Sequence, residues 1–273
     1  METTGLESSS RMSVCILLLL LVYENTFADG TARFPYIPNQ EFQYAVRYGP
    51  LRIGTIRLAA RADTSFKGSL AHHLAISFDS NPDIPFIHLQ SRTESYVDAK
   101  GGYALATISH DMTDSGWVTT WYDFDYEGRK ISYTVSYNGR TVSERSEPMQ
   151  FDGGYQDGLS LVLFLARRAD ILDTVLVPTV VESGQQLTLV AFNRKEDTVA
   201  LGEIGKKILC FHVSGRANYR ALFGVTGDFQ AWISADPFRI PVQAKLRVLI
   251  GSIVIKLEKW SEAAWGRKLQ KPY

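Results

Sequence analysis

The chain has 273 residues, of which 45% are apolar and 12% aromatic, so it can bury the core of one large or two small domains, and extensive disorder is excluded. The 29 Lys and Arg residues balance the 29 Asp and Glu residues, which gives a formal net charge of zero. This balance lacks the basic excess that nucleic-acid-binding proteins show, and no nucleic-acid partner is expected.

The N-terminus has the pattern of a secretory signal. An apolar run over residues 14–22 follows Arg11 and precedes Thr26-Phe27-Ala28, which offers small residues for cleavage. The sequence therefore predicts a signal peptide over residues 1–28 and an exported protein, periplasmic or associated with the outer membrane. The run is shorter than the ~20 apolar residues that span a bilayer, so no permanent transmembrane span is expected after cleavage. Retention of the segment as an anchor is the alternative.

Cleavage after Ala28 would leave a mature chain with 28 basic and 26 acidic residues and with Cys210 as its single cysteine. One cysteine cannot form an internal disulfide, so the core must supply the stability. Cys210-Phe-His212 on a strand could provide two metal ligands, but a site needs three or four. The sequence predicts a buried, unreactive thiol, with no metal and no cofactor.

Strand-like alternation of apolar and polar residues begins in the mature chain at Phe42 and recurs to its end. Glycine-bearing turns such as Glu127-Gly128 and Asn138-Gly139 separate the segments. This rhythm predicts a mainly β protein with a single curved antiparallel sheet, or an open or half β-barrel, and one or two covering helices. The predicted strands are Phe42 to Tyr48, Leu51 to Ala60, Leu70 to Phe78, Trp117 to Phe124, Ile131 to Tyr137, Leu187 to Phe192, Lys207 to Val213 and Tyr219 to Phe223.

Two segments interrupt the alternation. Pro82 to Glu94 is expected to form a short helix across one end of the sheet. Gln156 to Asp170 is predicted as a longer helix, because Asp157 can cap its start and Arg167 and Arg168 stand near its end. This helix is apolar on nearly all sides and should be buried against the sheet.

No sequence pattern assigns a catalytic residue. His72 alternates with Leu70 and Leu74 and is expected in the core, and Gly158-Leu-Ser160 lacks the second glycine of a nucleophile elbow. Asp123, Asp125 and Glu127 cluster at a strand end without a facing partner cluster, which favours a solvated strand end. A non-enzyme is favoured; a hydrolase of envelope glycans or lipids, using Asp123, Asp125 or His110, is the alternative.

The last third of the chain predicts an antiparallel meander. Val242, Ala244, Leu246 and Val248 alternate with polar residues, Asp236-Pro237 opens one turn, and Gly251 marks the next.

The same segment, from Phe229 to Leu257, resembles the bacterial family known as domain of unknown function 3108 (DUF3108). The likeness extends upstream through Glu41 to Tyr48, Ser95 to Asp98 and Asp157 to Ser160, so it covers about residues 40–259. The resemblance implies an exported, β-rich protein without an established activity, and it carries over no catalytic residue. One β-rich domain is expected over residues 29–261, followed by a polar tail over residues 262–273.

These patterns favour a non-enzymatic envelope protein that binds a lipid or another apolar ligand in a groove between the sheet and the helix. Aromatic residues either fill a sheet core or line such a groove, and both interpretations stay open. The second hypothesis is an envelope scaffold that docks another protein through a strand edge or an aromatic patch. The candidate ligand-lining residues are Phe42, Tyr44, Trp121, Phe164, Phe211 and Trp232.

Overall fold

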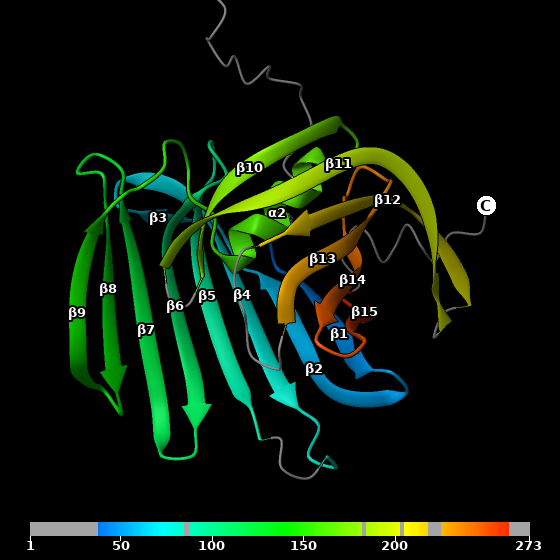
Figure 1. Cartoon of the computed structure of the whole chain (residues 1–273), viewed down its shortest axis with the longest axis horizontal. Helices are drawn as coiled ribbons and strands as arrows, with labels where there is room; N and C mark the ends of the chain where they lie inside the picture. The colour runs from blue at the N-terminus through cyan, green and yellow to red at the C-terminus, as the bar shows by residue number, and fades with distance from the viewer. Residues whose placement is uncertain (1–37, 85–87, 182–183, 203–204, 218–224, 262–273) are drawn as a thin grey trace, which may run out of the picture. The chain divides into compact units, whose positions relative to one another are not determined.

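Figure 1 shows the computed structural model of the chain, which describes residues 38–84, 88–181, 184–202, 205–217 and 225–261. These residues belong to one compact unit, Phe34–Tyr273. The predicted signal peptide over residues 1–28, the predicted tail over residues 262–273 and the whole of the predicted strand from Tyr219 to Phe223 lie outside the described residues.

The described part of the chain contains fifteen strands and the helix α2 (Gly158–Arg168). The strands are β1 (Gln40–Tyr48), β2 (Leu51–Ala60), β3 (Thr64–Phe66), β4 (Ser69–Ser80), β5 (Gln90–Asp98), β6 (Ala104–Thr113), β7 (Gly116–Asp125), β8 (Lys130–Tyr137), β9 (Arg140–Pro148), β10 (Leu172–Val181), β11 (Gly184–Leu201), β12 (Lys206–Arg216), β13 (Val225–Ser234), β14 (Pro241–Val248) and β15 (Ser252–Trp260).

All strands join one antiparallel sheet in the order β10-β11-β12-β13-β14-β15-β1-β2-β4-β5-β6-β7-β8-β9, while β3 pairs only with β4. The C-terminal meander therefore continues directly into β1, because β15 pairs with β1. The sheet does not close on itself, and β9 and β10 are its edge strands. The predicted fold class, a mainly β protein with one curved, open antiparallel sheet and a covering helix, is confirmed (Figure 1).

Helix α2 starts where the sequence predicts. Asp157 accepts hydrogen bonds from the backbone N–H groups of Leu159 and Ser160, and the Ser160 hydroxyl accepts one from the Asp157 N–H at 2.8 Å. This reciprocal capping satisfies donors that would otherwise be buried without partners. Leu159 and Leu163 pack against β4 and β5, whereas Leu165 and Ala166 pack against β10 to β13, so the helix joins both halves of the sheet.

The sheet buries apolar residues on both of its faces. Val190, Phe192 and Val213 face the helix, while Val199 and Cys210 belong to a second core on the opposite face. On β12, Val213 and Cys210 are an odd number of residues apart, so the ordinary alternation of side chains along a strand places them on opposite faces. The second core consists of Phe42, Tyr44, Val199, Leu201, Ile208, Cys210, Trp232, Ile240, Val242 and Leu257.

The segment that leads from β9 to α2 bridges the open side of the sheet. The Tyr155 carbonyl accepts a hydrogen bond from the N–H of Ala104 at 2.8 Å, and Gln156 exchanges hydrogen bonds with Pro178 and Val180 of β10 at 2.8 and 2.9 Å. Tyr155 is fully buried. This segment thus connects edge strand β10 to β6, although the two strands do not pair.

The segment between β4 and β5 differs from the sequence prediction. The short helix expected over Pro82 to Glu94 is wrong: residues 82–84 form turns and a bend, and Gln90–Glu94 belong to β5. Residues 85–87 lie outside the description. Among the residues that the structure describes, no helix has the length and apolar character needed to span a membrane.

Candidate functional site

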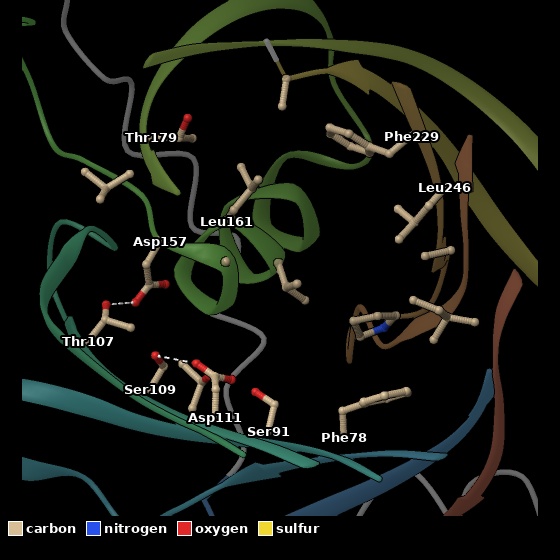
Figure 2. Close-up of a pocket in the computed structure, with 18 of the residues that line it drawn as sticks. Phe78, Ser91, Thr107, Ser109, Asp111, Asp157, Leu161, Thr179, Phe229 and Leu246 are labelled. Atoms are coloured by element: carbon tan, nitrogen blue, oxygen red, sulfur yellow. Dashed lines mark hydrogen bonds between the residues drawn. The ribbon is translucent and has the colours of Figure 1, made fainter. Parts of the chain in front are cut away.

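A cavity of about 870 Å³ lies beside α2, between the β5–β6 part of the sheet and the β13–β14 part. Figure 2 shows Leu161 projecting from the helix on the side of Thr179, while Phe78 and Ser91, which also line the cavity, lie on the other side of the helix in this view. Because the helix touches both halves of the sheet at its ends, it holds the two walls apart and leaves this volume unfilled. The curvature of the sheet and the position of α2 therefore create the cavity.

One wall of the cavity is polar and comes from β5 and β6. The two strands pair so that Ser91 lies opposite Asp111 and Thr93 lies opposite Ser109. Side chains directly opposite each other in an antiparallel pair point to the same face, so their hydroxyl and carboxylate groups converge on the cavity. The Ser109 hydroxyl donates a hydrogen bond to Asp111 at 3.0 Å (Figure 2).

The facing walls are mostly apolar. They come from α2 and from β4, β13, β14 and β15, and Figure 2 shows Phe229 and Leu246 on the side away from the hydroxyl-bearing wall. Ala231 and Ala244 are cross-strand partners, and their small side chains leave room there. The apolar residues of these walls are Phe78, Leu161, Val162, Leu165, Phe229, Ala231, Ile233, Ala244, Leu246 and Ile255.

Asp157 links the polar wall to the helix. Its carboxylate caps α2 and also accepts a hydrogen bond from the hydroxyl of Thr107 on β6 (Figure 2). Both side chains line the cavity and are buried. The carboxylate therefore connects the start of α2 to strand β6.

None of the six aromatic residues predicted as ligand contacts is among the described residues that line the cavity. Phe42, Tyr44 and Trp232 lie together in the core on the opposite face of the sheet, where burial raises the pKa of Tyr44. Phe164 and Phe211 pack against the core under α2. Their role in ligand binding stays a prediction.

Trp121, the sixth of these residues, lies on β7 and is 38% exposed. Its strand neighbour Tyr122 points to the opposite face and lines the cavity with Phe124. Trp121 therefore lies on the same strand as two cavity-lining residues but on the other face of that strand.

A polar cluster surrounds Trp232 on the far face. The indole N–H donates to Asp197 Oδ2 at 2.8 Å, and this hydrogen bond lowers the pKa of Asp197. His212 lies with its ring 5.0 Å from the Trp232 ring, and burial, together with the positive charge of Lys195, lowers the pKa of His212. These contacts place Trp232 firmly in the core.

Cys210 is fully buried in the same core, as predicted, and it is a free cysteine. Burial raises the pKa of its thiol to about 12, with a further contribution from the charge of Asp197. A thiol with so high a pKa remains protonated at neutral pH and is unreactive. In the described part of the chain, no group of three or more His, Cys, Asp or Glu side chains is arranged to hold a metal ion.

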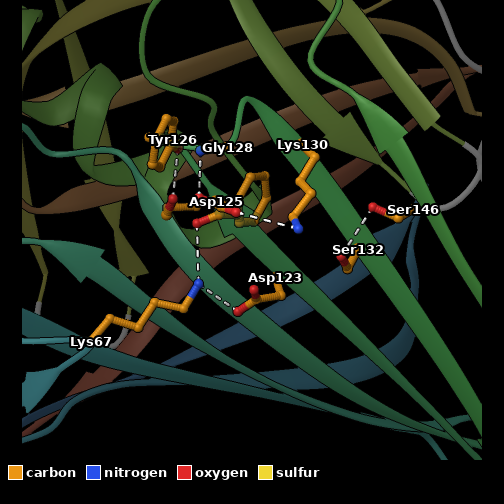
Figure 3. A network of polar contacts seen from close by, with 10 residues as sticks. Lys67, Asp123, Asp125, Tyr126, Gly128, Lys130, Ser132 and Ser146 are labelled. Carbon is orange, nitrogen blue, oxygen red and sulfur yellow. Dashed lines mark hydrogen bonds and ion pairs between the residues drawn. The ribbon is translucent and has the colours of Figure 1, made fainter.

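The carboxylates considered for hydrolysis take part in surface ion pairs (Figure 3). Lys67 pairs with Asp123 at 2.6 Å, and Lys130 lies 3.6 Å from Asp125. Asp125 also accepts a hydrogen bond from the backbone N–H of Gly128, which is the main cause of its lowered pKa. A carboxylate whose charge is stabilised in this way is a poor proton donor at neutral pH.

His110 does not join these carboxylates. Asp123 lies opposite Ala106 on β6, four residues away from His110, which corresponds to roughly 13 Å along the strand. His110 Nδ1 instead lies 2.9 Å from the hydroxyl of Thr119. The three residues therefore do not form a common catalytic site in this structure.

The sequence signal for the polar wall was present but weak. Ser91, Thr93 and Ser95 alternate with Arg92 and Glu94, so β5 has a period of two without an apolar face. Hydrophobic periodicity cannot detect a strand whose inward side chains are hydroxyls. This explains why the strand was interpreted as a helix and why the cavity residues were missed.

The family model described as "Protein of unknown function (DUF3108)" matches residues 43–258. None of the curated proteins matches the chain. The matched range agrees closely with the 40–259 range expected from the motifs.

Two solved structures resemble the fold. The first is a β-barrel-like protein of the domain of unknown function DUF1849 from Brucella abortus, with a TM-score of 0.54 and 11% identity, covering 82% of this chain and 98% of the other. The second is a protein with a YmcC-like fold from Bacteroides fragilis, with a TM-score of 0.33 and 8% identity, covering 84% and 98%. At these identities the first likeness shows a shared β-barrel-like fold.

Proposed function

This chain belongs to the DUF3108 family of proteins of unknown function, and we propose that it is an exported, non-enzymatic protein that binds an apolar ligand in the cavity beside α2. The observation that supports this function most directly is the cavity itself. Its volume of about 870 Å³ falls within the range of about 300–1,000 Å³ that is usual for small-molecule sites.

The apolar walls supply the driving force for binding. Each Å² of apolar surface that a ligand removes from water contributes about 25 cal/mol, so a hydrocarbon chain lying against Leu161, Phe229 and Leu246 would bind without any charged contact. A lipid acyl chain or another apolar small molecule fits this chemistry.

The proposal of export rests on residues 1–28 of the sequence. The apolar run after Arg11 and the small residues at Thr26-Phe27-Ala28 are typical of a cleaved signal, which would deliver the protein to the periplasm or to the outer membrane. Cell fractionation of the full chain and of a chain that starts at Asp29 tests this. The full chain should be found in the envelope fraction and the shortened chain in the cytoplasm.

A titration with a neutral, environment-sensitive dye such as N-phenyl-1-naphthylamine tests ligand binding. Delipidated protein should increase the dye fluorescence saturably, at about one dye per chain, and native mass spectrometry of protein purified from cell envelopes should reveal a bound small molecule. A lack of saturable binding together with a ligand-free mass would refute the proposal.

A pair of tryptophan variants locates the binding. Leu161→Trp places a larger side chain in the cavity and should weaken dye binding at least ~tenfold, because the new ring takes up space that the ligand needs. Leu172→Trp makes the same exchange at an edge-strand residue that is 79% exposed, and it should leave the affinity unchanged. Equal binding by both variants would place the dye elsewhere.

One surface feature favours a second candidate function, the docking of an envelope protein. Leu176 and Leu189 are cross-strand partners on β10 and β11, Leu172 lies on the same face, and all three are exposed. An edge strand beside an apolar patch can accept a strand from another protein. Cross-linking in cells should then recover a stoichiometric protein partner, and Leu176→Lys should abolish its recovery.

A further inference from the structure

The titratable side chains of the cavity are unevenly charged. Asp111, Asp114 and Asp157 line it, whereas no Lys or Arg is found among the described residues of the lining. His88, which is exposed at the rim, is the one described lining residue that can acquire a positive charge.

The three carboxylates differ in how far the protein compensates them. Asp157 receives two backbone N–H groups at a helix N-terminus and the hydroxyl of Thr107, so its negative charge is well stabilised. Asp111 is half-buried and receives a hydrogen bond from Ser109. Asp114 is exposed and directly follows Thr113, the last residue of β6. The uncompensated negative charge is therefore concentrated at the polar wall.

The same wall offers neutral hydrogen-bonding groups. Ser91 and Thr93 line the cavity next to Ser109, and their side chains make no hydrogen bond with other described residues. A hydroxyl can donate or accept, so this wall can bind a neutral polar group or an ammonium group equally well.

We propose that the cavity selects amphiphiles without a negative charge. Their hydroxyl-bearing or cationic head lies on the β5–β6 wall beside Ser109 and Asp111, and their apolar tail lies against α2 and β13–β14. This inference deepens the proposed ligand-binding function and rests on it. A carboxylate or phosphate head on this wall would lie near Asp111 with no Lys or Arg among the described lining residues, and two negative charges repel strongly where water is excluded. Free fatty acids and acidic phospholipids are therefore poor ligands.

Three amphiphiles with the same C12 chain test the selectivity for head-group charge. Monododecanoylglycerol is neutral, dodecyltrimethylammonium is cationic and dodecanoate is anionic. Each competes with the neutral dye on delipidated full-length protein at pH 7.5, below its micelle concentration. The neutral and cationic ligands should displace the dye at concentrations at least ~tenfold lower than dodecanoate, because the repulsion acts on the anion alone.

Removing one charge should reduce this difference. Asp111→Asn keeps an acceptor for the Ser109 hydroxyl and should strengthen dodecanoate binding and weaken dodecyltrimethylammonium binding several-fold. Glu144→Gln removes one negative charge from the exposed edge strand β9, none of whose described residues lines the cavity, and should change neither.

The outcomes separate this inference from the function on which it rests. Equal displacement by all three ligands, or preference for dodecanoate, would overturn the charge selectivity while leaving ligand binding intact. Failure of the neutral dye and of all three ligands to bind would instead refute the ligand-binding function, and the selectivity with it.

Discussion

At the scale of single residues, Asp157 connects helix α2 to the sheet. It caps α2 through two N–H groups and accepts the buried hydroxyl of Thr107, so it holds the helix and strand β6 together. The helix in turn defines one wall of the cavity. A single carboxylate thus links the local start of a helix to the geometry of the candidate site.

Replacing Asp157 by alanine should lower the free energy of unfolding by about 2–4 kcal/mol, because a cap is lost and a buried hydroxyl is left without its acceptor. Asp157→Asn keeps a side-chain oxygen in place and should cost clearly less. Urea denaturation of the three proteins measures both values. A loss below about 0.5 kcal/mol for the alanine variant would contradict the structural role.

His212 should make stability depend on pH in a defined direction. Its pKa in the folded protein is lowered from 6.5, chiefly by burial, so the unfolded chain binds a proton more readily. As the pH falls below about 6.5, protonation therefore favours the unfolded state, and stability decreases until the pH reaches the lowered folded pKa. Below that pKa both states are protonated and the loss ends.

Denaturant unfolding at pH 7.5, 6.5 and 5.5 measures this effect. The free energy of unfolding should fall more steeply with acidification in the parent protein than in His212→Gln, which cannot titrate. The carboxylates with lowered pKa, Asp125, Asp197 and Asp228, affect stability only at more acidic pH, because the ordinary value is already 3.8. Parallel pH profiles for the two proteins would show that the His212 environment is solvated.

At the scale of elements, close packing between strands constrains β12. A Cβ atom on Gly215 would lie 2.9 Å from the Leu189 carbonyl oxygen and 2.2 Å from the ring of Phe229. The flexible ring could move, but the backbone of β11 cannot do so without disturbing the ladder. Only the absence of a side chain allows β11, β12 and β13 to approach each other here.

Gly215→Ala should therefore destabilise the protein by about 1–3 kcal/mol. Gly158 is the matched control, because it lies in the first turn of α2 and a Cβ there would meet no atom within 4 Å. Gly158→Ala should be neutral or stabilise the protein by about 0.4–1 kcal/mol, since alanine restricts the unfolded chain more than glycine does. Thermal or urea unfolding distinguishes the two; equal effects would mean that β12 tolerates the extra volume.

The elements that sequence reasoning predicted correctly have strong local signals. Asp157 marks the start of α2, Asp236 accepts a hydrogen bond from the Phe238 N–H at 2.8 Å in its turn, and Asp98 accepts two within the turn after β5. Short side chains that bond to the nearby backbone identify these positions without any tertiary information.

The missed elements lack such a signal. Strand β9 is exposed almost throughout and therefore has no apolar periodicity, although its charges and Pro148 are typical of an edge strand. Strand β10 contains Pro178, which is tolerated because the strand lies at the edge of the sheet. Position in the sheet explains both cases, and position is not a property of the local sequence.

The candidate site was harder to predict than the fold. Large aromatic residues such as Phe42 and Trp232 attract attention as ligand contacts, but they lie in a core on the face of the sheet opposite α2. The cavity is instead lined by small hydroxyl side chains and aliphatic residues from strands far apart in sequence. Which face of each strand borders empty volume depends on the complete packing.

At the scale of the whole sheet, the edge strands β9 and β10 do not pair with each other. The segment before α2 instead connects β10 to β6 through backbone hydrogen bonds. Tyr155 is central to this arrangement. Its hydroxyl donates to Gln185 at 2.7 Å and accepts from the Phe151 N–H at 2.9 Å, while Phe124, Tyr133 and Val180 surround its ring. The cavity is bounded on this side by Val180 and Phe124 as well.

Tyr155→Phe should consequently loosen β10 more than the rest of the sheet. The variant leaves the Phe151 N–H and the Gln185 amide without one partner each, at a cost of about 1–3 kcal/mol. Opening of the bridge should speed hydrogen exchange of the β10 amides, including the Val180 N–H that donates to Gln156, by roughly tenfold to a hundredfold. Amides of β4 and β5 should change little, because α2 and its cap still hold them.

Tyr103→Phe is the control, since the Tyr103 ring packs edge-on against Tyr126 in the same region and its hydroxyl makes no hydrogen bond with other described residues. Hydrogen exchange followed by mass spectrometry of peptides compares the variants strand by strand. If the β10 amides exchanged at the same rate in Tyr155→Phe as in Tyr103→Phe, the Tyr155 hydrogen bonds would contribute no local stability to β10. Faster exchange confined to β10 would instead show that an open sheet keeps its cavity wall through one buried tyrosine.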